Sequence, residues 1–309
     1  TTTLLFKDVA GTADAYTINF SKDTAGVSAG TVDIAKIETV TVNSVGKAGA
    51  ANTIALTDAD AKSLVVTGDS TLTLTFVGGF GTNGTAGNGL GVSTIDASAS
   101  TAGISLTNFS NLLIAENGLT IKGGSGVDTI TATNIAASKD LTIDAGAGND
   151  TINTTGATGK VIVNAGAGND TLTVGAVGGT FTLGAGNDTI DVTAAKAGTV
   201  TAAATAITEA AAKKTIITDA SKGDIIKGLN TALLSKIVLT TEANIDDALG
   251  TATGTASTNT WFQYAGDTYI VKGDANVGFT EGDTLVKLNG LVDLSTSSLN
   301  ITTGDLTIA

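Results

Sequence analysis

The chain of 309 residues has no cysteine, proline, methionine or histidine, and all 16 of its basic residues are lysine. Without cysteine it forms no disulfide, so if it folds outside the cell it needs another cross-link, such as a bound metal. The lack of histidine, cysteine and arginine removes the groups on which most catalytic sites depend. Because methionine is absent, we expect residue 1 not to be a translation start and the chain to be a fragment or a processed piece.

Positive charge is scarce as well. The 29 acidic residues leave a formal net charge of −13. Such a surface makes nucleic acid a poor partner, because its phosphates are bound mainly by lysine and arginine. The sequence has no signal peptide and no run of eighteen apolar residues, and therefore predicts no membrane-spanning helix. Bound cations would relieve the self-repulsion that disfavours the compact state of so acidic a chain.

The chain is rich in glycine, with 40 residues, and in threonine and alanine. Within residues 1–90, runs such as 37–42, 63–67 and 71–76 alternate apolar residues with threonine or serine, the pattern of a strand with one dry face. Residues 78–89 have the composition of a loop. Helix candidates are residues 232–237, 242–249 and the alanine-rich 202–214, which is equally well an insertion between coils. The sequence thus predicts an all-β fold with a few short helices.

Four segments repeat nearly the same glycine-rich sequence at intervals of 18 to 22 residues. They are residues 123–131, 145–153, 165–173 and 183–191. The first matches G-G-x-G-x-D-x-U-x, the nonapeptide of calcium-binding β-rolls, and the others keep its second and fourth glycine, its aspartate and its apolar U position. Glycine and Asn-Asp also favour plain β-turns. Four loops in register, each followed by a β-prone run, favour metal binding instead.

These loops offer the ligands that Ca²⁺ prefers, six to eight oxygen atoms. Glycine allows a positive φ and brings backbone carbonyl groups close to an ion, while Asp128, Asp150, Asp170 and Asp188 add charge. One loop cannot complete the coordination shell, but two loops stacked at the inter-strand spacing of about 4.8 Å can. Four adjacent loops leave about three gaps, so we expect about three inter-loop ions. Because the sites do not exist in the unfolded chain, binding should be coupled to folding.

The repeat can be extended towards the N-terminus. Ser93 and Asn111 take the place of the metal-binding aspartate, although we interpret both as turn residues rather than ligands. The successive intervals are then 18, 17, 22, 20 and 18 residues, and an 18-residue turn is two nonapeptide halves. We therefore expect one continuous coil with calcium along one edge and ordinary turns along the other. The apolar residues after the loops should form an interior ladder of Ile130, Ile152, Leu172 and Ile190.

With these nonapeptides, the chain resembles the RTX group of type I-secreted bacterial proteins. More narrowly, residues 93–98, 262–271 and 286–294 are similar to the C-terminal region of a Gram-negative surface-layer (S-layer) protein. The resemblance implies a right-handed parallel β-roll or β-helix, a lattice held by calcium, and export by an ABC transporter that reads the C-terminus. It also implies an anchor to outer-membrane lipopolysaccharide near the N-terminus, which we expect to lie outside this chain.

The resemblance further implies which atoms bind the metal. Carbonyl groups at positions one and three of one loop would act together with those at positions two and four of its neighbour. With the aspartates, the candidate ligands are Gly123, Gly124, Ser125, Gly126, Asp128, Ala145, Gly146, Ala147, Gly148, Asp150, Ala165, Gly166, Ala167, Gly168, Asp170, Gly184, Ala185, Gly186 and Asp188. Leu183, at position one of the last loop, leaves the backbone of that loop in question.

Two further acidic segments invite a metal-binding interpretation. Asp219, Ser221 and Asp224 resemble a calcium turn that follows the roll in this family, or else form a solvated turn. Asp58 and Asp60 lack the remaining spacing of an EF-hand, and we interpret them as surface residues.

Two features remain near the C-terminus. Trp261, Tyr264 and Tyr269 favour the core of a small β-domain over a glycan site. Residues 305–309 end the chain as an export signal, a last strand or both.

The sequence predicts three regions: β-rich N-terminal coils over 1–90, an RTX calcium-binding β-roll over 91–229, and a C-terminal β-domain with an export signal over 230–309. We expect a secreted structural protein of a bacterial surface layer that folds and self-assembles on binding calcium. The alternatives are an RTX adhesin that binds a host or glycan surface, and the export and folding module of a secreted hydrolase. No enzymatic activity is expected, because the clustered carboxylates, which in pairs could cleave glycosides, are committed to metal loops.

Overall fold

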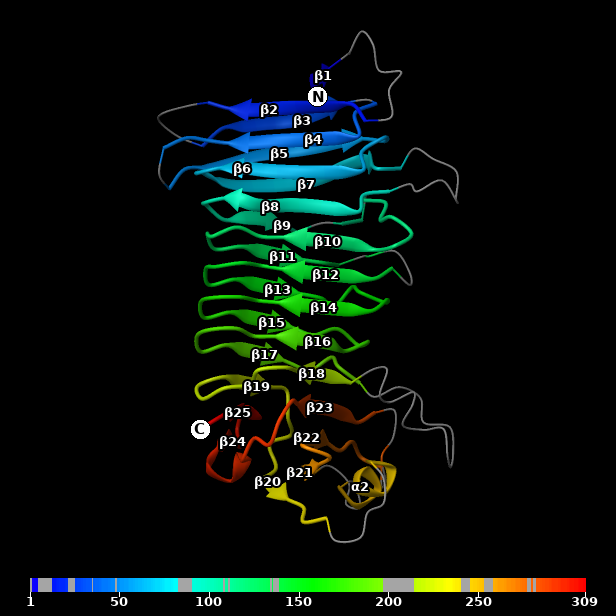
Figure 1. Cartoon of the computed structure of the whole chain (residues 1–309), viewed down its shortest axis with the longest axis vertical. Coiled ribbons are helices and arrows are strands. Elements are labelled where there is room, and N and C mark those ends of the chain that lie inside the picture. The colour runs from blue at the N-terminus through cyan, green and yellow to red at the C-terminus, as the bar shows by residue number, and fades with distance from the viewer. Residues whose placement is uncertain are drawn as a thin grey trace. The chain divides into compact units, whose positions relative to one another are not determined.

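The computed structural model describes most of the chain. The described residues are 2–4, 13–21, 26–34, 36–47, 49–82, 91–107, 109–110, 112–133, 135, 139–196, 214–239, 245–252, 258–276, 279 and 282–309. Their regular structure is nearly all β (Figure 1). The chain divides into two compact units, residues 1–160 with 164–167, and residues 161–163 with 168–309. The boundaries expected near residues 90 and 229 stay predictions.

The first unit is built from two parallel sheets between which the chain alternates. One sheet contains, in spatial order, β1 (Thr2–Leu4), β3 (Ser28–Ile34), β5 (Ala51–Asp58), β7 (Thr71–Phe80), β9 (Ile104–Leu106), β11 (Thr129–Thr131) and β13 (Thr151–Asn153). The other contains β2 (Ala15–Phe20), β4 (Thr39–Ser44), β6 (Ser63–Gly68), β8 (Thr94–Ser100), β10 (Leu119–Lys122) and β12 (Leu141–Asp144). Each coil thus adds one strand to each sheet, which is the expected parallel β-roll (Figure 1).

Stacked apolar side chains fill the space between these sheets. Val40, Leu64, Ile95, Ile121 and Ile143 are successive register partners, and none has exposed surface. The same strands direct threonine, serine and charged residues outward, because successive side chains of a strand point to opposite faces. The period-two pattern of the sequence therefore sets which face of each coil is dry.

The second unit begins as the same kind of roll and ends in an antiparallel cap. One sheet runs β15 (Thr171–Thr173), β17 (Thr189–Asp191), β19 (Ile225–Lys227), β25 (Asp305–Thr307) and β24 (Ser298–Asn300). The other runs β16 (Gly179–Thr182), β18 (Thr215–Ile217), β23 (Thr284–Leu288), β22 (Asp267–Lys272), β21 (Asn259–Tyr264) and β20 (Leu234–Lys236). Pairing is parallel up to β19 and β23, and the last strand, β25, pairs antiparallel with β19. Strand β14 (Val161–Asn164) spans the division between the units.

The C-terminal cap has a small core of its own. Helix α2 (Ile245–Ala252) packs on β21, and its Leu249 joins a buried cluster with Phe262, Tyr269 and Leu285. The rings of Phe262 and Tyr269 stack with centroids 5.3 Å apart. A 3₁₀ turn, η1 (Leu294–Thr296), follows. As expected, the aromatic residues of this region serve the core, since Trp261 is also buried.

Three local expectations need correction or a limit. Residues 232–237 hold the strand β20 rather than a helix, whereas the second helix candidate overlaps α2. Of the alanine-rich segment 202–214, all but the last residue lie outside the described residues. Asp58 is not a surface residue, because only 1% of it is exposed. No helix in the described part of the chain is long and apolar enough to cross a membrane.

Candidate calcium-binding loops

All four glycine-rich loops occupy equivalent turns of the roll. Each follows an even-numbered strand and leads into the next odd-numbered one. The loop at 123–128 joins β10 to β11, that at 145–150 joins β12 to β13, and that at 183–188 joins β16 to β17. Leu183, at position one of the fourth loop, is fully buried, as Ala145 and Ala165 are at the same position of the second and third loops.

The glycines of these loops are required by backbone shape and by a close carbonyl group. Gly146 and Gly148 have φ of +98° and +130°, and Gly184 and Gly186 have +98° and +139°. These values lie in the region that residues with a Cβ atom rarely adopt. A Cβ atom on Gly186 would also overlap the carbonyl oxygen of Gly168 in the preceding coil. The loops thus hold main-chain oxygen atoms of one coil against the α-carbons of the next.

Hydrogen bonds join neighbouring loops directly. In the first unit, the N–H of Ala147 donates to the carbonyl of Gly124 at 3.0 Å, and the N–H of Ala167 donates to that of Gly146 at the same distance. In the second unit, the N–H of Gly168 donates to the carbonyl of Ala185 at 2.8 Å. The loops therefore form stacked ladders, as the shared-ion arrangement requires.

The aspartates of the loops form a second ladder, and all of them are buried. In the first unit, the N–H of Asp128 donates to Oδ1 of Asp150 at 2.7 Å. In the second unit, the N–H of Asp170 donates to Oδ1 of Asp188 at 2.8 Å. Each of these carboxylates therefore caps the backbone of the preceding coil through one oxygen atom.

The second oxygen of Asp188 is the observation that best fits a cation site. Oδ2 of Asp188 is buried and accepts no hydrogen bond. Burial first, and then the nearby carboxylates of Asp170, Asp224 and Asp219, raise the pKa of Asp188 to about 6. A buried carboxylate oxygen without a partner is costly, and a bound cation would remove that cost. The donor set of carbonyl and carboxylate oxygens fits Ca²⁺.

Backbone carbonyls would supply most of the coordination. Within the described ranges, no group of three or more acidic side chains converges in a way that could hold a metal. The number of ions, and the ligand role of each residue predicted from the nonapeptides, stay predictions.

The first loop differs from the others although its sequence fits the nonapeptide best. Gly124 and Gly126 do not have the left-handed φ of their counterparts. Both oxygens of Asp128 are engaged, with the N–H of Ile104 at 2.7 Å and that of Gly124 at 3.0 Å. Burial raises the pKa of Asp128 as well. The first loop therefore stacks on a preceding coil, the one that contains Ile104, and that coil has no nonapeptide.

The register that we extended towards the N-terminus is wrong. Ile104, and not Asn111, stacks next to Asp128, since β9 pairs with β11 through Ser105 and Thr129. Ser93 lies beside the opposite sheet, where its carbonyl accepts from the N–H of Thr120 at 2.9 Å. Asn111 itself falls outside the described residues.

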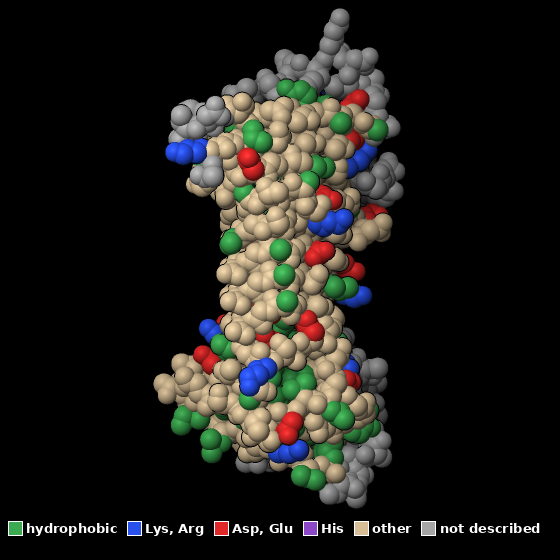
Figure 2. All heavy atoms as spheres, turned by 60° about the vertical axis from the view of Figure 1, so that its left-hand side comes forward, with side chains coloured by type: hydrophobic (Ala, Val, Ile, Leu, Met, Phe, Trp, Pro, Cys, Tyr) green, Lys and Arg blue, Asp and Glu red, His purple; other side chains and the backbone are tan. Residues whose placement is uncertain are grey.

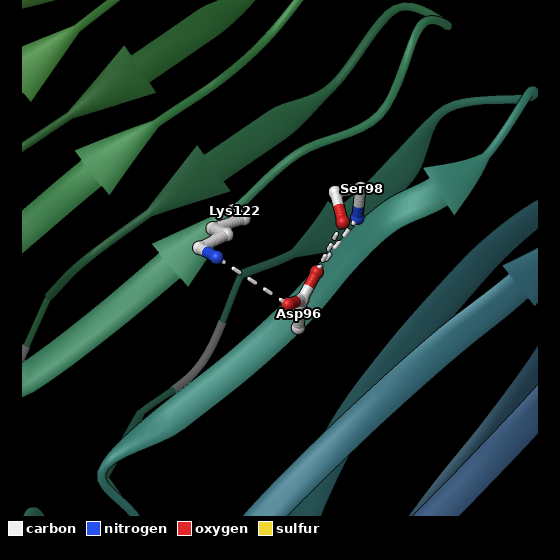
Figure 3. A network of polar contacts seen from close by, with 3 residues as sticks. All are labelled: Asp96, Ser98 and Lys122. Atoms are coloured by element: carbon white, nitrogen blue, oxygen red, sulfur yellow. Dashed lines mark hydrogen bonds and ion pairs between the residues drawn. The ribbon is translucent and has the colours of Figure 1, made fainter.

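A polar network on the outer surface fixes the start of the first loop (Figure 3). Lys122 is the last residue of β10, and its Nζ lies 3.6 Å from Oδ2 of Asp96 on the neighbouring strand β8. Asp96 also accepts hydrogen bonds from the backbone and the hydroxyl of Ser98. The hydroxyl of Ser98 chiefly, and Lys122 to a lesser extent, hold the pKa of Asp96 below its usual value. All three groups are solvent-exposed enough that this network orients the chain more than it stabilises it.

Comparison with protein families supports the motif. The model of the RTX calcium-binding nonapeptide repeat (4 copies) matches residues 142–156 and 155–177. The chain carries RTX calcium-binding repeats. The matched RTX segments contain the second and third loops, while the first and fourth are placed in the same turns by the structure. No curated protein matches the chain.

Asp224 continues the row of stacked aspartates in the RTX loops. The sequence placed Asp224 in a possible calcium turn but did not predict that it stacks next to Asp188. The N–H of Asp188 donates to Oδ1 of Asp224 at 3.0 Å, and the N–H of Ser221 donates to its Oδ2 at 2.8 Å. The available signal was the sequence Gly223-Asp224-Ile225-Ile226, which keeps a glycine, the aspartate and the apolar U position. Asp224 lies 36 residues after Asp188 but in the neighbouring coil, because β17 pairs directly with β19.

Asp219 completes the end of the fourth loop. Its two carboxylate oxygens accept the N–H groups of Leu183 and Gly184, each at 2.8 Å. The segment 219–224 is therefore a turn stacked on the fourth loop, with its acidic side chains directed at the backbone of that loop.

Proposed function

We propose that this protein is a calcium-dependent structural protein of a bacterial surface layer, secreted and assembled outside the cell. The observation that carries the calcium part is the stack of RTX loops, in which the buried Oδ2 of Asp188 has no hydrogen-bond partner. The assembly part rests on the resemblance of the chain to S-layer proteins. RTX repeat proteins are typically secreted, which supports the extracellular setting.

Calcium would act as the staple that the absent cysteines cannot provide. Extracellular calcium sites typically have Kd values of about 10⁻⁴–10⁻³ M. At a free concentration about ten times Kd, each site adds roughly 1.4 kcal/mol to the free energy of unfolding. About three such sites would add roughly 4 kcal/mol, a large part of the usual 5–15 kcal/mol. The roll would thus be unfolded during export, where calcium is scarce, and folded at the cell surface.

The outer faces of the coils suit side-by-side packing. Most of the face shown in Figure 2 is neither charged nor hydrophobic, and lysines and acidic residues are scattered over it. Threonine rows such as Thr129 beside Thr151 follow from the strand register. Packing of such faces would not force like charges together. We propose no enzymatic activity for this chain.

The first experiment is a calcium titration followed by circular dichroism. We expect strand content to appear over micromolar to millimolar calcium and to disappear with chelator. Equal strand content in both conditions would contradict the calcium-dependent fold.

Electron microscopy of the calcium-loaded protein then tests the assembly. A two-dimensional lattice supports the surface-layer role. Glycan-dependent binding without a lattice would favour an adhesin, and dispersed monomers that bind no surface would favour an export and folding module. Either of the last two results overturns the surface-layer proposal.

A further inference from the structure

Asp58 is a buried acidic residue far from the calcium loops in sequence. It is the last residue of β5, and its register partner in β7 is Phe80, which has no exposed surface. On the other side of β5, the neighbouring strand β3 ends at Ile34, also fully buried. Only 1% of Asp58 is exposed. Its carboxyl group therefore lies among apolar side chains, at the end of strand β5 in the N-terminal coils.

Only one of the two carboxylate oxygens of Asp58 accepts a hydrogen bond. Its Oδ1 accepts the N–H of Asp60 at 3.0 Å, whereas Oδ2 is buried and has no hydrogen-bond partner. The backbone N–H groups of Asp60 and Ile37 favour the ionised form. Burial opposes ionisation more strongly than these N–H groups favour it, and the carboxylates of Asp60 in the following turn and Asp33 on β3 add smaller opposing effects.

We propose that Asp58 carries a proton in the folded protein in mildly acidic surroundings and loses it around neutral pH, which makes the N-terminal coils a pH-responsive element separate from the calcium loops. A protonated carboxyl group needs no counter-ion, so it fits between Ile34 and Phe80 without the cost of a buried charge. Loss of the proton places an unpaired charge there, next to two other carboxylates. These coils are therefore tightest in mildly acidic surroundings and loosen as the pH rises.

The direction follows from the linkage between protonation and folding. Burial raises the pKa of Asp58 from 3.8 to about 7 in the folded state. Between these two values the folded state holds the proton and the unfolded state does not, so stability falls as the pH rises. The contribution is complete below about pH 3.8 and is lost as the pH passes about 7. Each pH unit in this window changes the unfolding equilibrium constant by up to about tenfold.

The test compares the full chain with Asp58→Asn, which resembles the protonated carboxyl group but cannot ionise. The control is Asp69→Asn, which removes an exposed carboxylate from the same coils. Hydrogen exchange of peptides from β4 to β7 is measured at several pH values between about 5 and 8.5, in calcium and in chelator. At each pH the rates are compared between proteins, so that the intrinsic pH dependence of exchange cancels.

We expect the ratio of opening constants, wild type over Asp58→Asn, to rise about tenfold per pH unit up to about pH 7 and then to level off. Asp69→Asn should follow the wild type. A ratio that does not change with pH overturns the proposal. So does a loss of protection in Asp58→Asn that occurs only in calcium, because Asp58 would then be a cation ligand.

A direct measurement covers the case in which the variant fails to fold. The carboxyl carbon of Asp58 in the wild-type protein can be titrated by nuclear magnetic resonance. A midpoint near 7 supports the proposal, and a midpoint near 4 overturns it.

Discussion

The backbone N–H of Asp188 donates to Oδ1 of Asp224 at 3.0 Å, although 36 residues separate the two. Asp224 has the same relation to Asp188 as Asp188 has to Asp170. The turn at 219–224 is therefore part of the stack that holds the RTX loops, and residues outside the nonapeptides help to set the geometry of the last loop.

Replacement of Asp224 separates its hydrogen bonds from its charge. Asp224→Ala leaves the buried N–H of Asp188 without an acceptor, which should cost about 1–3 kcal/mol. Asp224→Asn keeps an acceptor and should cost less, while weakening calcium binding by the fourth loop through the lost charge. Chemical unfolding followed by the fluorescence of Trp261, with and without calcium, measures both. Equal losses in the two variants would show that the hydrogen bond to Asp188 carries no stability.

Two glycines of the second unit form a matched pair that tests close packing between loops. Gly186 has φ of +139° and would place a Cβ atom on the carbonyl oxygen of Gly168, whereas Gly266 has φ of +88° and open space around it. Gly266→Ala should therefore cost only backbone strain, about 1–2 kcal/mol. Gly186→Ala adds a backbone clash, and we expect it to cost more than about 4 kcal/mol. Thermal unfolding in saturating calcium measures the difference, and similar losses would mean that the loops are not closely stacked.

The ion pair of Asp267 with Lys287 predicts a pH dependence for the C-terminal cap. Oδ2 of Asp267 lies 2.7 Å from Nζ of Lys287, and its Oδ1 accepts the N–H of Gly290. These contacts, the hydrogen bond from Lys287 first, hold the pKa of Asp267 below its usual value of 3.8. Their stabilisation is present above about pH 4 and is lost as the pH falls through the lowered pKa.

Asp267→Asn should thus destabilise the cap by about 1 kcal/mol at neutral pH. The difference from wild type should vanish in strong acid. Unfolding monitored through Trp261 at several pH values is the measurement, and a constant difference down to pH 2 would contradict the expected linkage.

Part of the fold could be read directly from particular residues. The alternation in 71–76 predicts a strand with one buried face, and the structure has it in β7, where Leu72, Leu74 and Phe76 point inward. The nonapeptides predicted loops in equivalent turns, and the structure places them so. Local patterns of this kind are enough to predict strands and turns, because the alternation of a strand and the composition of a glycine-rich turn each involve only a few neighbouring residues.

The sequence did not show which residues stack on each other in neighbouring coils, because the coils differ in length. Extension of the repeat at intervals of 17 and 18 residues gave Asn111 the place next to Asp128, yet Ile104 lies there, 24 residues away. Asp224 was recognised only as a member of a possible calcium turn, because nothing in the sequence shows that its coil has 36 residues. The acidic pair at 58 and 60 gave no sign that one carboxyl group would be buried. Which residues stack depends on how many residues each turn absorbs, and only the pairing of strands fixes that number.

The sequence by itself determined the chemistry of the loops, their chain order and the dry face of each strand, since these follow from residue type and short-range periodicity. Only the tertiary structure decided which carboxylates meet which backbone groups, why the first loop differs from the rest, and where a charge is costly. Those outcomes depend on contacts between residues 18 to 36 positions apart, whose distances are set by the stacking of whole coils.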